Sequence, residues 1–106
     1  MLAKKFKLPA IVWETQRQQK PLRVVNTPLL SMRSFRTTLP YARVGVVVGT
    51  KVDKRATVRN RIRRAIYDAF QARFDKLPIA DYTCMVRAGM KNLMRVEIIK
   101  EVEKML

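Results

Sequence analysis

One short run, ARVGVVVGT at residues 42–50, constrains the fold more than any other part of the sequence. It is rich in β-branched residues and almost wholly apolar, which is typical of a strand that is covered on both faces. We therefore expect this run to form a central strand of a sheet.

The stretches on either side of this run predict three more strands. Two of them, residues 22–25 and 29–35, precede it and are separated by the turn-forming sequence Asn26-Thr27-Pro28. A second turn region, residues 37–40, separates them from the strand predicted at the apolar run itself, residues 41–48. This spacing favours an antiparallel meander. Residues 81–86 predict a fourth strand.

Three stretches have a helical pattern. The segment from Pro9 to Lys20 predicts a short amphipathic helix, and a second helix is expected from Val58 to about Phe74, with Thr57 as its cap. The second helix has an apolar stripe of Val58, Ile62, Ala65, Ile66, Ala69 and Ala72. A last helix, capped by Asn92, is expected to pack through Met94, Ile98, Val102 and Met105. The predicted order is α-β-β-β-α-β-α.

The 106 residues, 48% of them hydrophobic, suffice for one core, so residues 1–106 are expected to form a single α+β domain. Lys and Arg outnumber Asp and Glu by 23 to 8, a formal net charge of +15. Residues 1–64 have 16 basic and 2 acidic groups, whereas residues 65–106 have 7 and 6. A strongly basic surface on one part of a small domain favours a nucleic-acid partner.

The densest charge lies between residues 51 and 64. Arginine guanidinium groups match phosphate oxygens, and the start of a helix adds backbone donors on the same side. An asparagine within the same stretch can bind a base edge or a ribose hydroxyl. The candidate RNA-binding residues are Lys51, Lys54, Arg55, Arg59, Asn60, Arg61, Arg63 and Arg64.

The sequence KVDKRATVRNRIRRAIYDAF, at residues 51–70, resembles the signature of the bacterial ribonuclease P protein, in which a Lys-rich turn leads into an arginine helix. The resemblance covers roughly residue 22 to the C-terminus and is weakest over residues 1–21. Gly49 and Thr50 replace the usual serine and lysine, Tyr67-Asp68 replaces the common Arg-Glu, and the usual first-helix phenylalanine is absent, with Trp13 as its nearest substitute.

This resemblance implies an α-β sandwich of the ribosomal protein S5 domain 2-like type, with a left-handed β-α-β crossover against the usual right-handed preference. It also implies that the arginine helix docks on a catalytic RNA, while a cleft between the first helix and the sheet holds the 5′ leader of precursor tRNA. Trp13, Met32 and Phe35 are the candidate leader contacts, and an ordinary core role for them is equally compatible with the sequence.

The protein itself has no evident catalytic residues. The chain has no histidine, its one cysteine, Cys84, lies in an apolar strand, and its carboxylates are scattered. Under the family resemblance, catalysis belongs to the RNA and its bound Mg²⁺, and the protein assists endonucleolytic removal of the leader without binding a cofactor or metal stably.

Two other hypotheses about the function stay open. A non-enzymatic ribosomal or ribosome-assembly protein can have a similar small basic domain, and a DNA-binding helix-turn-helix fits less well because a strand precedes the arginine helix. Glu14 and Gln16 interrupt the first apolar patch too early for a secretory or membrane-spanning segment, although a basic organelle presequence is a further alternative. We expect a cytoplasmic protein with no membrane or small-molecule partner.

Overall fold

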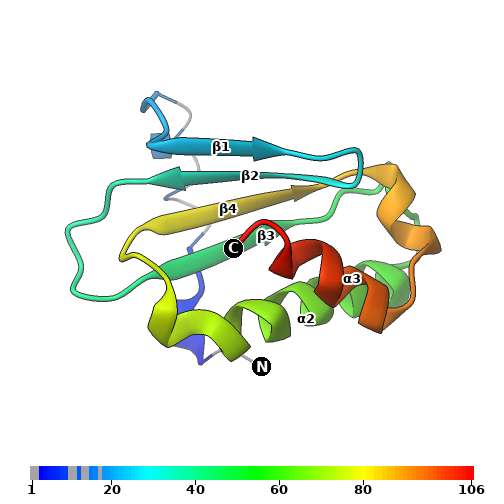
Figure 1. Cartoon of the computed structure of the whole chain (residues 1–106). Helices are drawn as coiled ribbons and strands as arrows, with labels where there is room; N and C mark the ends of the chain where they lie inside the picture. Colours follow the sequence, from blue (N-terminus) through cyan, green and yellow to red (C-terminus); the bar gives the residue numbers. More distant parts are fainter. Residues whose placement is uncertain (1–2, 10–11, 13–14, 17) are drawn as a thin grey trace.

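Four strands form one mixed sheet in the computed structural model, which describes residues 3–9, 12, 15–16 and 18–106 (Figure 1). The strands are β1 (Arg23–Asn26), β2 (Leu30–Phe35), β3 (Arg43–Val47) and β4 (Asp81–Val86). They lie in the order β1-β2-β4-β3. β2 is antiparallel to both β1 and β4, whereas β3 and β4 are parallel.

This order corrects two predictions. The expected meander is wrong, because β4 lies between β2 and β3. The apolar strand β3 is therefore an edge strand and not a central one. Its outer edge is covered by the N-terminal segment, where Lys7 forms a parallel bridge with Val44 and the Leu8 N–H donates to the Val44 carbonyl at 2.9 Å.

Two helices pack on the same face of the sheet (Figure 1). They are α2 (Ala56–Arg73) and α3 (Arg95–Glu103), and short 3-10 turns lie at η1 (Lys4–Phe6), η2 (Phe74–Lys76) and η3 (Ala88–Asn92). The predicted stripe is confirmed for the fully buried Ile62, Ala65, Ile66 and Ala69. Ala72 is exposed, because the buried stripe turns toward the larger Phe70 as the helix ends.

The chain passes from β3 through α2 to the parallel strand β4. In Figure 1 both strands point to the right, β4 lies above β3, and α2 lies on the near side of the sheet. If the view is turned until the strands point upward, β4 lies to the left of β3. This is the left-handed form of the crossover that the family resemblance implied.

Both predicted helix caps are wrong. Thr57 lies inside α2, which starts at Ala56 without a side-chain cap. Asn92 lies in η3, and α3 is instead capped at Met94, whose N–H donates to the Glu97 carboxylate at 2.9 Å. α2 thus starts two residues before the predicted Val58, whereas α3 starts later than predicted because η3 extends through Asn92. Within the helix predicted from Pro9 to Lys20, the described residues Val12, Thr15 and Gln16 are helical, and residues 10, 11, 13, 14 and 17 lie outside the described part of the chain.

Candidate nucleic-acid interface

The basic turn between β3 and α2 is held by short-range hydrogen bonds. Val52 is buried beneath it, and the Val52 N–H donates to the Gly49 carbonyl at 3.0 Å. The Asp53 carboxylate accepts bonds from Nε and Nη2 of Arg55 at 3.1 and 3.0 Å, and from its backbone N–H at 2.8 Å. The Arg55 guanidinium, followed by this backbone donor, lowers the pKa of Asp53 from 3.8 to about 2. Asp53 is therefore charged near neutral pH and fixes the shape of the turn.

Arg59 fastens this turn to the first part of α2. Its Nη1 donates to the backbone carbonyls of Lys54 at 2.7 Å and Asp53 at 3.1 Å. These carbonyls accept bonds from a guanidinium that still has other donors. Arg59 thus holds the turn in place, and its half-buried side chain is less available to a ligand than the exposed Lys54 beside it.

The outer side of α2 presents the remaining predicted cations. Arg61 and Arg64 are exposed, and the Arg61 Nη2 donates to the Lys91 carbonyl at 3.3 Å. Arg63 is half-buried and donates through Nη1 to the Asn60 Oδ1 at 2.6 Å. The eight predicted RNA-binding residues therefore follow one continuous path, from the turn along the first half of α2.

The structure adds Lys91 to this surface. A shallow hollow of about 400 Å³ lies over the turn, and Lys91 of η3 lines it together with residues 50–55. Lys91 is 30 residues from Arg61 in sequence, so no local pattern could have shown that the two meet. Only the packing of η3 against α2 reveals it.

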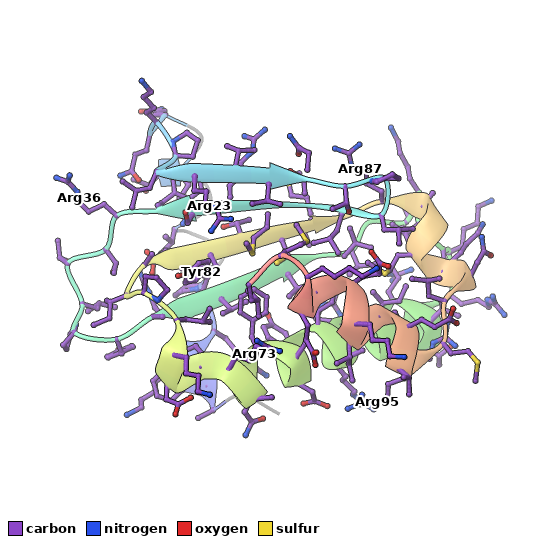
Figure 2. The ribbon with its side chains drawn as sticks, viewed as in Figure 1. Arg23, Arg36, Arg73, Tyr82, Arg87 and Arg95 are labelled. Atoms are coloured by element: carbon purple, nitrogen blue, oxygen red, sulfur yellow. The ribbon has the colours of Figure 1, made fainter. Side chains whose placement is uncertain are left out.

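Four carboxylates elsewhere in the described chain pair with other basic residues. Arg43 pairs with Asp81, Arg73 with Glu103, Arg95 with Asp68 and Lys104 with Glu101, as their ion pairs show; Figure 2 labels Arg73 and Arg95. Within the path from the turn to α2, the one ion pair among described residues joins Arg55 to Asp53. The turn and the first half of α2 thus hold the densest run of basic residues without an ion pair in the described chain, at Lys51, Lys54, Arg59, Arg61, Arg63 and Arg64.

The three candidate leader contacts do not form one cluster. Met32 is 4% exposed and faces the core beneath α2 and α3, opposite Cys84 in the strand pairing. Phe35 is also 4% exposed but points to the other face of the sheet, because odd and even positions of β2 alternate. Met32 therefore does not fit a cleft on the side opposite α2 and α3. Trp13 lies outside the described residues.

The side of β2 and β4 that faces away from α2 and α3 has other exposed groups that the sequence analysis missed. Arg33 is exposed opposite Thr83, and Met85, 47% exposed, lies opposite Ser31 on the same face. Gln16 covers part of this face and accepts a 2.7 Å bond from the Thr83 hydroxyl. Its buried amide nitrogen has no hydrogen-bond partner among the described residues. The period-2 alternation of β2 was the signal that could have identified Arg33.

Cys84 is fully buried in β4. Burial raises the pKa of its thiol to about 12, so its thiolate is not available near neutral pH. In the part of the chain that the structure describes, no group of three or more His, Cys, Asp or Glu side chains could hold a metal ion.

Residues 13–106 match the model of the family described as Ribonuclease P. The chain belongs to the ribonuclease P protein family. Curated ribonuclease P protein components support this assignment. That of Edwardsiella ictaluri is 34% identical over 87 residues, covering 82% of this chain and 72% of the relative, and that of Baumannia cicadellinicola is 33% identical with 82% and 75% coverage.

Solved ribonuclease P proteins have the same fold. The Staphylococcus aureus protein superposes with a TM-score of 0.84 at 19% identity, covering 93% of this chain and 90% of its own. The Thermotoga maritima ribonuclease P protein gives 0.76 at 17% identity, with 94% of each chain covered. Like other members of the ribonuclease P family, this chain therefore builds an α+β fold around one mixed sheet. None of the helices in its described part is long and apolar enough to cross a membrane.

Proposed function

We propose that this ribonuclease P protein binds the catalytic RNA subunit through the basic turn and the outer side of α2. The observation that carries this proposal is the concentration of cations without carboxylate partners on that single path. Arg61 and Arg64 are exposed on a regular helix, and Lys51 and Lys54 are exposed in the adjoining turn. A rigid helix fixes the spacing between its cations, so it can match the spacing of phosphates in a folded RNA.

The contribution of the protein is electrostatic and positional. Lys and Arg side chains neutralise closely spaced phosphates and release their counterions, which raises the affinity between RNA elements that would otherwise repel one another. Mg²⁺ held by the RNA would supply the activated water for phosphodiester hydrolysis, and no residue of this chain takes part in that chemistry. The proposed partners are ribonuclease P RNA and precursor tRNA, in the cytoplasm.

We further propose that the face of the sheet opposite α2 and α3 contacts the single-stranded 5′ leader. Arg33 supplies a charge for the backbone, and the exposed Met85 supplies a soft apolar surface for a base. The buried amide nitrogen of Gln16 has no hydrogen-bond partner among the described residues, and the amide oxygen of the same side chain binds Thr83 of this face. Phe35, which lies on this side, supports the sheet beneath it, whereas Met32 belongs to the opposite core.

Affinity measurements at several salt concentrations test the RNA-docking proposal. The Arg61→Ala/Arg64→Ala variant is compared with Lys76→Ala/Lys100→Ala, which removes the same charge from exposed positions outside the docking path. The salt slope is the slope of the logarithm of the binding constant against the logarithm of the salt concentration, and each phosphate contact contributes about −0.9 to it in duplex and about −0.7 in single-stranded RNA. The magnitude of this slope should therefore fall by about 1.4 to 1.8 in the arginine variant. The lysine variant should keep most of it.

The choice of RNA in the same measurement tests the ribosomal alternative. A bacterial ribonuclease P RNA should bind more tightly than a ribosomal RNA fragment of equal length at equal salt. Tighter binding to the ribosomal fragment, or equal slopes for the two variants, would contradict the proposal.

A further inference from the structure

The N-terminal segment brings a cation to α2 that lies more than fifty residues away in sequence. Residues 7 and 8 run along the outer edge of β3, where Lys7 bridges Val44 and the Leu8 N–H donates to the Val44 carbonyl at 2.9 Å. Leu8 is buried, 7% exposed, and anchors the segment. The position of Lys7 is therefore fixed by backbone pairing and not by its own side chain.

Tyr67 of α2 lies beneath the Lys7 side chain. The Lys7 ammonium is 5.1 Å from the centre of the Tyr67 ring, a cation-π distance. Tyr67 is 7% exposed, and this burial raises the pKa of its hydroxyl, against the smaller opposing effects of a backbone hydrogen bond with Val46 and the charge of Arg63. The Tyr67 ring is therefore uncharged and fixed in position, and it supports the Lys7 side chain at the surface of α2. It forms the floor of the hollow described next.

A hollow of about 230 Å³ lies between this floor and the arginine helix. Its lining residues are Lys7, Asn60, Arg63, Arg64 and Tyr67. Arg63 is oriented by its 2.6 Å bond to the Asn60 Oδ1, which leaves the amide nitrogen as the donor end of Asn60. Among the described residues, no carboxylate forms an ion pair with Lys7, Arg63 or Arg64.

These features define the chemistry of a ligand. Three cations converge on a hollow that has no acidic group, and arginine and lysine donors both suit the oxygens of a phosphate. One phosphate with a few water molecules, each occupying about 30 Å³ in the liquid, fits a space of this size. The floor is an aromatic ring already covered by Lys7, so the hollow favours a phosphate over a stacked base.

We propose that this hollow binds one backbone phosphate of the partner RNA, with Lys7 of the N-terminal segment completing a site begun by Arg63 and Arg64. The proposal rests on the RNA docking proposed above and adds a residue that lies far from the arginine helix in sequence. It assigns the N-terminal segment two roles: it covers the edge of β3, and it supplies part of the RNA contact.

The test is the salt dependence of binding to a ribonuclease P RNA transcript for Lys7→Ala and for the matched control Lys4→Ala. Lys4 is exposed, and its removal changes the net charge equally. Lys7→Ala should lower the salt slope by about 0.7 to 0.9, as expected for one lost phosphate contact, whereas Lys4→Ala should lower it much less. Lys7→Arg should restore the slope, which a purely structural role for the Lys7 stem would not require.

A double-variant comparison separates this proposal from the general docking of α2. If Lys7 and Arg64 hold the same phosphate, their losses in binding free energy are non-additive, whereas Lys7 and Arg61 should be additive. Equal slopes for Lys7→Ala and Lys4→Ala, with a reduced slope for Arg64→Ala, would overturn the Lys7 site and leave the RNA docking intact. Unchanged slopes for all three variants would overturn both.

Discussion

Arg43 and Asp81 form a two-pronged ion pair between the first residues of β3 and β4. The Arg43 Nε donates to Asp81 Oδ1 at 3.0 Å, and its Nη2 donates to Oδ2 at 2.8 Å. The two residues are direct partners in the parallel strand register. The Asp81 hydrogen bond raises the pKa of Arg43. The pair fixes the one parallel strand pairing of this sheet.

The Arg43–Asp81 pair should therefore contribute measurably to stability. Asp81 is almost fully buried and Arg43 is partly exposed, so Arg43→Ala leaves a buried carboxylate without its partner. We expect a loss of about 2 to 3 kcal/mol in the free energy of unfolding, measured by urea titration. The exposed Arg36→Ala is the control and should change it by less than about 0.5 kcal/mol. Equal stability of the two variants would contradict this role.

Arg59 and Arg64 should differ in what their removal changes. Arg59→Ala removes two bonds to turn carbonyls and should lower the unfolding free energy by about 1 kcal/mol, since the bonds are charged but partly solvated. Arg64→Ala should leave stability unchanged and weaken RNA binding alone. Thermal unfolding and RNA affinity, measured on both variants, check this. A destabilised Arg64→Ala would show that the side chain has a structural contact.

The Asp53 carboxylate should titrate near pH 2, well below its ordinary 3.8. Because its folded pKa is lowered, the contribution of Asp53 to stability is present above about pH 4 and is lost as the pH falls toward 2. Carboxyl chemical shifts followed by NMR between pH 1.5 and about 5 measure this. Arg55→Ala should return the titration toward 3.8, and an unchanged midpoint in that variant would contradict the assigned cause.

Cys84 should resist alkylation in the folded protein. The thiol is fully buried and its folded pKa, about 12, lies above the ordinary 9.0. Ionisation therefore favours the unfolded state, and the contribution of Cys84 to stability is lost as the pH rises above about 9. Labelling at pH 8 should occur at the rate of unfolding and rise steeply in denaturant. Rapid labelling of the native protein would show that β4 is open to solvent.

The sequence predicted the elements of this fold better than their arrangement. Periodicity located β2, β4, α2 and α3, because local burial patterns are set by neighbouring residues. It misplaced the apolar strand β3 at the centre of the sheet, because full burial does not distinguish a central strand from an edge strand covered by another segment. The covering residues, Lys7 and Leu8, lie more than thirty residues away in sequence.

The residues of the candidate site could likewise be predicted only in part. The basic path from Lys51 to Arg64 could be predicted because it is continuous in sequence. Lys91 and Lys7 could not, since only tertiary packing brings them to α2. Met32 was assigned to a cleft by residue type alone, and the strand alternation places it in the opposite core.

Reconstituted cleavage tests the central claim most directly. The protein is combined with a bacterial ribonuclease P RNA, and removal of the precursor tRNA leader is measured at low Mg²⁺, where phosphate repulsion is least screened. The wild type should stimulate cleavage, Arg61→Ala/Arg63→Ala/Arg64→Ala should lose that stimulation, and Lys76→Ala/Lys100→Ala/Lys104→Ala should retain it. Equal stimulation by the arginine variant would place the docking surface elsewhere, and no stimulation by the wild type with its cognate RNA would contradict the proposed function.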